Sequence, residues 1–229
     1  MERQIYYVGV NNAPPDKELG QYSKIIRQSE LDDPAYVYSK CPVHTHKQER
    51  TFVVLSPIHF DLKVNRTSEG CGIECSNHRL LDELDENHIR SPRPVIQVKM
   101  PKFLFWTSDD DIWFEFNDHP MTSLNNNLVA VPGWFNLSNW TRSTSFAFTI
   151  VDEKKPVTIK RGDPIYRIAF HSTDPNDKFT LVPELDIEKA SKIKKEFTEM
   201  FIQGRTDGSW KPKVFSKTTT EKKCPLGHT

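Results

Sequence analysis

The sequence has no long apolar stretch and little cysteine. No segment approaches the ~18 apolar residues of a membrane-spanning helix, and the opening Met1-Glu2-Arg3-Gln4 has no apolar signal core. We therefore expect a protein made and kept in the cytoplasm, with no membrane partner. Four cysteines in 229 residues are too few for a disulfide framework, so they are expected to be thiols. Lys and Arg (31) balance Asp and Glu (31), and nucleic acid is not favoured as a partner.

Glycine is also scarce, with 9 residues against 16 prolines, a ratio that favours short strands and ordered loops over a helical bundle. The chain nevertheless contains 14 Phe, 5 Trp and 6 Tyr, which excludes a disordered protein. Its length fits one large domain with appendages.

Short apolar or alternating segments recur along the chain and are separated by Asp, Asn, Pro and Gly. No helical pattern intervenes, so the spacing predicts a mostly β protein, an antiparallel β-sandwich or jelly roll with one C-terminal helix. The expected strands cover residues 5–10, 52–55, 58–64, 95–100, 102–107, 111–117, 128–131, 143–151, 157–159, 164–171 and 178–181.

Three parts are expected along the chain. Residues 1–182 form the sandwich, from which a polar insertion, 65–94, leaves the sheet. Residues 183–204 form the helix, with Gly204 as its C-terminal cap. Residues 205–229 form an extended basic arm, and residues 189–229 hold 10 Lys or Arg against 4 Asp or Glu.

A hairpin is expected where alternating segments flank Arg161-Gly162-Asp163. Gly162 permits a tight turn and Asp163 can accept hydrogen bonds from backbone N–H groups. This segment, 146–170, is similar to the Gly-Asp hairpin of dUTPase-type jelly rolls. The Arg-Ser-Gly phosphate loop and the acidic-Tyr pocket of those enzymes are missing, so we assign the hairpin a structural role and no catalytic residue.

A longer resemblance runs through the segments 38–42, 52–57, 131–134 and 162–165. These are Tyr-Ser-Lys-Cys-Pro, Phe-Val-Val-Leu-Ser-Pro, Val-Pro-Gly-Trp and Gly-Asp-Pro-Ile. In this order they resemble an uncharacterised domain family of bacteria and tailed phages, especially marine ones. The resemblance implies a β-sandwich with a C-terminal helix and a phage origin.

Two metal sites are considered. His59-x-Asp61 followed by His119 or His171 fits the facial triad of Fe(II)/2-oxoglutarate oxygenases. However, alternation with Ile58, Phe60, Leu62 and Val64 turns His59 and Asp61 away from the apolar face. Cys71, Cys75 and His78 offer three zinc ligands, with Cys224 or His228 as the fourth. Otherwise no cofactor is expected.

Aromatic residues concentrate between residues 103 and 148, where a sandwich core accounts for most of them. Trp134 and Trp140 are interpreted as interface residues, since indoles favour interfaces, and Trp210 and Phe215 as anchors of the C-terminal arm.

The leading hypothesis is a non-enzymatic phage structural or assembly protein, located in the virion. It would bind protein neighbours, or copies of itself, through sandwich loops and the arm. The alternatives are a jelly-roll Fe(II)/2-oxoglutarate oxygenase and a small-ligand or glycan-binding jelly roll.

Overall fold

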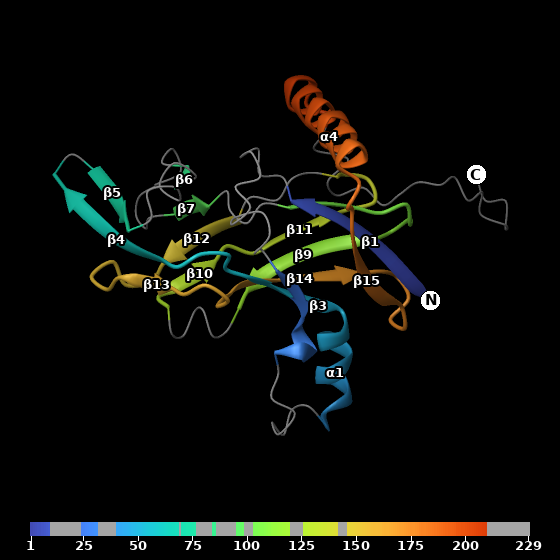
Figure 1. The fold of residues 1–229 in the computed structure, drawn as a ribbon, viewed down its shortest axis with the longest axis horizontal. Helices are drawn as coiled ribbons and strands as arrows, with labels where there is room; N and C mark the ends of the chain where they lie inside the picture. Colours follow the sequence, from blue (N-terminus) through green and yellow to red (C-terminus); the bar gives the residue numbers. More distant parts are fainter. Residues whose placement is uncertain are drawn as a thin grey trace, which may run out of the picture.

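The fold was analysed in a computed structural model of the chain. The structure describes residues 1–9, 24–31, 40–68, 70–76, 84–85, 95–98, 103–119, 126–141 and 146–209. It is mostly β, as the sequence predicts, and the strands form several antiparallel sheets around one core (Figure 1). The strands are β1 (Glu2–Gly9), β2 (Ile25–Arg27), β3 (Thr51–Leu55), β4 (Phe60–Thr67), β5 (Gly70–Cys75), β6 (Leu84–Asp85), β7 (Val95–Val98), β8 (Phe103–Trp106), β9 (Trp113–Asp118), β10 (Leu128–Ala130), β11 (Gly133–Asn136), β12 (Phe146–Ile150), β13 (Val157–Ile159), β14 (Pro164–His171) and β15 (Lys178–Pro183).

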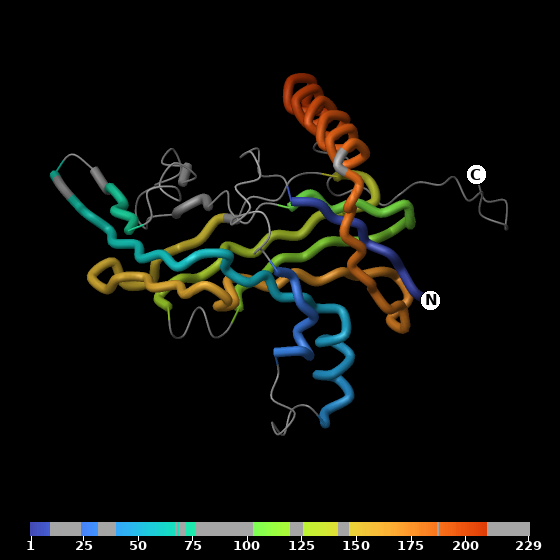
Figure 2. The backbone as a smooth tube through the Cα atoms, in the orientation of Figure 1, coloured from blue at the N-terminus to red at the C-terminus, as the bar shows by residue number. Residues whose placement is uncertain are grey.

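Four sheets share the core. Their strand orders are β15-β1-β8, β10-β12-β7-β6, β11-β9-β14-β3-β2 and β13-β4-β5. Neighbouring strands run antiparallel except β1 and β15, which pair in parallel. In Figure 2 the blue N-terminal strand β1 lies beside the orange segment that contains β15. Aromatic contacts join the sheets: Phe105 of β8 lies 5.3 Å from Phe114 of β9, and Phe148 of β12 lies 6.4 Å from Tyr166 of β14, centroid to centroid. These rings are buried and hold the layers together by apolar contact.

The predicted insertion 65–94 is partly wrong. β4 continues to Thr67, and β5 pairs with it antiparallel along its whole length. β6 also pairs with β7. Residues 65–67, 70–75 and 84–85 therefore belong to sheets rather than leaving them.

Helix α4 (Ile187–Asp207) follows β15, as predicted, but its end lies elsewhere. Asp186 caps its N-terminus by accepting hydrogen bonds from the backbone N–H groups of residues 188 and 189. Gly208, with φ = 75°, forms the C-terminal cap, whereas Gly204 is buried inside the helix. The helix packs Phe201 against Trp140, with ring centroids 6.2 Å apart. The helix thus includes residues 205–207 of the predicted arm; residues 210–229 lie outside the described part.

A second helix, α1 (Pro42–Glu49), was not predicted. It precedes β3 and is mostly polar, with Pro42 in its first turn. Thr51 joins the helix to the sheet, since its hydroxyl donates to the carbonyl oxygen of Lys47 over 2.8 Å. In Figure 1, α1 and α4 project from opposite sides of the sheets.

Candidate functional site

Strand β9 divides its side chains between the core and the surface. Phe114 is buried and Phe116 packs against the core, whereas Glu115 and Asn117 alternate with them on the outward face. Glu115 pairs with Trp134 on β11 and with Ala169 on β14. The five-stranded sheet therefore brings polar groups from β9 beside side chains of two neighbouring strands.

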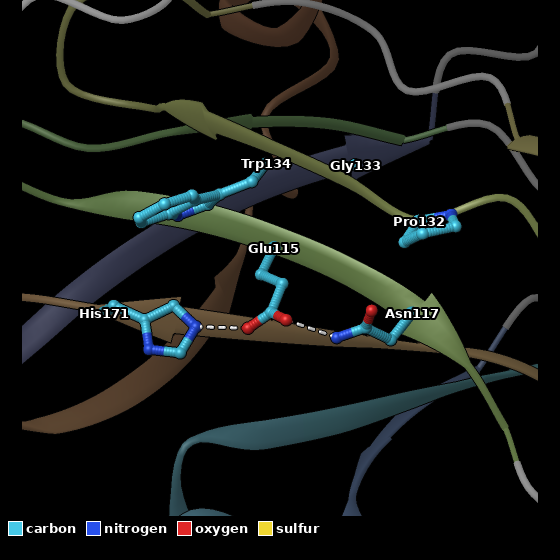
Figure 3. Close-up of a pocket in the computed structure, with 6 residues that line it drawn as sticks. All are labelled: Glu115, Asn117, Pro132, Gly133, Trp134 and His171. Carbon is cyan, nitrogen blue, oxygen red and sulfur yellow. Dashed lines mark hydrogen bonds and ion pairs between the residues drawn. The ribbon is translucent and has the colours of Figure 1, made fainter.

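These strands form a surface hollow of about 510 Å³. Figure 3 shows Trp134 and Pro132 on one side of it, His171 and Asn117 on the other, and Glu115 between them. Gly133 also lines the hollow. The hollow thus has two different walls. Trp134 and Pro132 form the apolar wall, and Glu115, Asn117 and His171 form the polar wall opposite it.

Glu115 organises the polar wall. His171 Nε2 lies 2.6 Å from Glu115 Oε2, and Asn117 Nδ2 donates to Glu115 Oε1. The hydrogen bond from His171 is the largest cause of a lowered pKa of Glu115, about 2, and it outweighs the opposing effect of burial. Glu115 is therefore a carboxylate at neutral pH. Because a carboxylate only accepts, Nε2 of His171 carries the shared proton and Nδ1 is left for another partner.

The apolar wall is built on two tryptophans. Trp134 is 60% exposed, and its ring lies 4.9 Å from that of Trp113, centroid to centroid. The indole N–H of Trp113 donates to Asp111 Oδ1 over 3.2 Å. Trp113 is fixed in this way, so one side of Trp134 is supported while much of its ring remains open to solvent.

Gly133 allows β11 to approach β9 closely. A Cβ atom at Gly133 would lie 2.1 Å from Cε1 and 2.6 Å from Cζ of Phe116. No larger residue fits without displacement, and the strand carries Trp134 at the next position. The absence of a side chain at Gly133 therefore sets the position of the apolar wall.

The sequence-predicted turn residues lie outside this hollow. Gly162 has φ = 87°, a conformation that favours glycine. The Asp163 side chain accepts from the N–H of Lys160 over 2.8 Å, and the N–H of Gly162 donates to the carbonyl oxygen of Ser56. Both residues act in the turn between β13 and β14.

The predicted interface residues Trp134 and Trp140 differ in their exposure to solvent. Trp134 is exposed, but Trp140 is only 8% exposed and lies between Phe135 and Phe201. The interface interpretation of Trp140 is therefore wrong, because core packing occupies its ring. Trp210 and Phe215 lie outside the described residues, so their role as anchors stays a prediction.

Of the predicted zinc ligands, the structure describes the strand that contains Cys71 and Cys75. Cys71 and Cys75 both belong to β5, and four residues of extended strand separate their Cα atoms by roughly 13 Å. Two thiolates on one tetrahedral zinc lie only about 4 Å apart, given Zn–S bonds of ~2.3 Å. The strand thus prevents these two cysteines from sharing one ion, and His78 lies outside the described residues. In the described part of the chain, no group of three or more His, Cys, Asp or Glu side chains could hold a metal.

His59 and Asp61 take the orientation predicted for them. Phe60, Leu62 and Val64 are buried, whereas the side chains of His59 and Asp61 are 55% and 43% exposed and lie 3.3 Å apart. Hydrogen bonding to Thr158 chiefly lowers the pKa of Asp61. The iron hypothesis requires ligands that point into the barrel. His59 and Asp61 instead face solvent.

Of the hollow's polar groups, sequence reasoning considered only His171, as an iron ligand. Glu115 and Asn117 were overlooked, although alternation with Phe114 and Phe116 places them on an exposed face. The pairing of Glu115 with His171 depends on strand order, which the sequence pattern does not contain.

No family model and no curated protein matches the chain. Solved structures with which it aligns include the native dUTPase of EIAV, at 9% identity and a TM-score of 0.38, over 80% of this chain and 98% of that one. A dUTPase from phage phi11 of S. aureus aligns at 9% identity and a TM-score of 0.33, over 71% and 94% of the two chains. The dUTPase of Staphylococcus bacteriophage 80alpha gives 8% and 0.33, over 60% and 81%.

The leading functional prediction is corrected by this comparison. The sequence favoured a non-enzymatic phage structural or assembly protein located in the virion, whereas the three solved structures named above are dUTPases. The predicted uncharacterised family is not shown, since no family model matches the chain. Two of these three proteins come from phages; the phage origin and virion location of this chain stay predictions, as do its protein partners and lack of cofactors. No helix in the described ranges is long and apolar enough to cross a membrane.

Proposed function

We propose that the hollow over β9 is an active site, in which His171 transfers a proton to or from a small ring-bearing substrate. The observation that carries this proposal is the 2.6 Å contact of His171 with the Glu115 carboxylate, beside the exposed ring of Trp134. A histidine held by a carboxylate is a general acid–base group, and an exposed indole is a surface for ring stacking.

The two walls favour a ligand with one apolar face and one polar edge. The ring would lie on Trp134 and Pro132, and its polar edge would meet Asn117 and His171. A volume of about 510 Å³ is in the range of small-molecule sites.

The chemistry follows from how Glu115 is used. Both of its carboxylate oxygens are already hydrogen-bonded, one to His171 and one to Asn117, so it acts as a positioning residue. It holds the His171 tautomer in which Nδ1 has a lone pair. Nδ1 would take a proton from a substrate hydroxyl or a bound water, and the Glu115 carboxylate would stabilise the resulting imidazolium. The same proton would return to the leaving group or product.

Hydrolysis of p-nitrophenyl acetate tests this proposal. His171 would take a proton from water, the hydroxide would add to the acyl carbon, and nitrophenolate would leave. Removing a general base costs typically ~10²–10⁴-fold in rate, so His171→Asn should lower the enzyme-dependent rate at least tenfold.

The matched control is His59→Asn, since His59 also pairs with a carboxylate but is exposed to solvent just before β4 and does not line the hollow. It should keep the wild-type rate. Equal rates in the His171 and His59 variants, with both proteins folded, would show that His171 is not the base.

A further inference from the structure

The polar wall of the hollow is organised around one group that can only accept hydrogen bonds. Glu115 is the one carboxyl group among the described residues that line the hollow, and its pKa of about 2 keeps it ionised at neutral pH. An ionised carboxylate has no proton to donate. Each neighbour that bonds to Glu115 must therefore turn a donor toward it, and this requirement decides which atoms the neighbours have left for a ligand.

Asn117 meets the requirement with its amide nitrogen. Nδ2 donates to Glu115 Oε1, and Figure 3 shows the amide oxygen of Asn117 turned away from Glu115. The flipped amide would set its oxygen against the carboxylate, so this orientation is excluded. The second N–H of the amide is carried by the nitrogen that already faces Glu115. Asn117 therefore has its Oδ1 atom, an acceptor, left for a ligand.

His171 meets the same requirement with one ring nitrogen. Nε2 carries the proton that it shares with Glu115 Oε2 over 2.6 Å, so Nδ1 keeps a lone pair. In Figure 3 Nδ1 lies on the side of the ring away from Glu115. His171 also offers a ligand an acceptor, and the two neighbours of Glu115 thus present the same polarity.

The apolar wall does not reverse this polarity. Pro132 has no backbone N–H, and Gly133 has no side chain. The indole N–H of Trp134 lies in the plane of its ring, whereas a ligand ring would lie on the open face of the indole. This donor therefore points past a stacked ligand and not at its polar edge.

Building on the proposed function, we propose that the substrate ring carries hydrogen-bond donors, N–H or O–H groups, on the edge that meets Asn117 and His171. Such an edge would donate to Oδ1 of Asn117 and to Nδ1 of His171. An edge with acceptors alone would set lone pairs against these two atoms and leave them without a partner, which lowers affinity. Glu115 would then select the substrate without touching it, through the orientation of its two neighbours.

The test compares benzamide with acetophenone, in which a methyl group replaces the NH₂ group while the planar ring and the carbonyl are kept. Their affinities would be measured from the NMR shift of the Trp134 indole N–H. We expect benzamide to bind at least about fivefold more tightly, although acetophenone is the more apolar of the two. Glu115→Gln should reduce this ratio toward one, because a glutamine amide both donates and accepts and so lets Asn117 and His171 turn either kind of atom to the ligand.

Glu74→Gln is the matched control. Glu74 is an exposed residue of β5 that also accepts from an asparagine, Nδ2 of Asn65 over 3.2 Å, but it is not among the described residues that line the hollow. It should keep the wild-type ratio.

Equal affinities of the two rings for the wild-type protein, or a wild-type ratio in Glu115→Gln, would overturn the donor edge. A saturable shift of Trp134 in the same titrations would leave the ring site standing, and the role of His171 is measured separately by its hydrolysis rate. Failure of both rings to shift Trp134 would overturn the ring site as well.

Discussion

Replacement of Gly133 by Ala tests how the apolar wall is positioned. The added Cβ would lie 2.1 Å from Cε1 of Phe116, far inside van der Waals contact. The Phe116 ring is partly buried, packs against the core and lies 6.5 Å from Phe114, centroid to centroid, so moving it away would disturb these contacts. Overpacking of this kind costs about 1–3 kcal/mol.

The expected loss of stability can be measured by thermal unfolding. For a chain of this size, 1 kcal/mol corresponds to roughly 2–4 °C in Tm, so Gly133→Ala should lower Tm by about 2–12 °C. Circular dichroism would follow the sheet, and fluorescence would report the displaced Trp134. The affinity of the hollow for ring-bearing ligands should also fall, because the apolar wall that contains Trp134 is displaced.

Gly72→Ala provides the control. Gly72 also lies within a strand, but its nearest neighbour to an added Cβ would be the Asn65 carbonyl oxygen at 3.8 Å, an ordinary contact. Its Tm should stay within about 2 °C of wild type. If Gly133→Ala were as stable as Gly72→Ala and bound rings equally well, the close approach of β11 to β9 would not position Trp134.

Three further substitutions probe the scaffold. Gly162→Val forces a β-branched residue to φ = 87° and should cost upward of ~1 kcal/mol, read as a lower Tm; an unchanged Tm would remove the turn argument. Burial raises the pKa of Asp177, but the hydrogen bond from Arg3 and other partners lower it to about 2. Because this folded-state pKa lies below the ordinary 3.8, the stabilisation is present above about pH 4 and is lost as pH falls toward 2. Asp177→Asn should therefore lower the free energy of unfolding, measured in urea, at pH 7. It should also reduce the further fall in that free energy between pH 4 and pH 2, and a fall as steep as that of wild type would contradict this role. Asp186→Ala removes the α4 cap and should cost about 1 kcal/mol by urea unfolding; no change would mean that packing alone holds the helix start.

Much of the fold could be predicted because its strands alternate clearly. The segment 164–171 places Ile168 and Phe170 inside and Arg167 and His171 outside, as a period of two requires. Helix α4 was predicted from its apolar period, but Gly204 was chosen as its cap because any late glycine satisfies the pattern. Only the backbone conformation distinguishes it from Gly208.

Other elements were missed for identifiable reasons. β11 begins at Gly133, directly after Pro132. The pair Pro132-Gly133 is typical of a break between strands, whereas Gly133 here is the first residue of a strand and allows its close approach to Phe116. Helix α1 has no apolar stripe to reveal it. β5 is rich in Gly and Cys, and its pairing with β4 is a long-range property.

The candidate site was the hardest part to predict. Glu115, Trp134 and His171 are separated by 19 and 37 residues in sequence and meet because β9 lies between β11 and β14. No local spacing records that order. Sequence reasoning did single out Trp134, as an interface residue, but it did not identify the polar groups beside it.

The central claim, that the hollow over β9 binds the ring of a small substrate, can be tested by mapping benzamide binding over the whole chain by NMR. Only the position of the bound ring is measured, so the result is independent of the inference about hydrogen-bond donors. We predict the largest shifts at Trp134, Asn117 and His171, and none at the exposed pair of His59 and Asp61. Shifts centred on that pair, or no saturable shift at Trp134, would contradict the account.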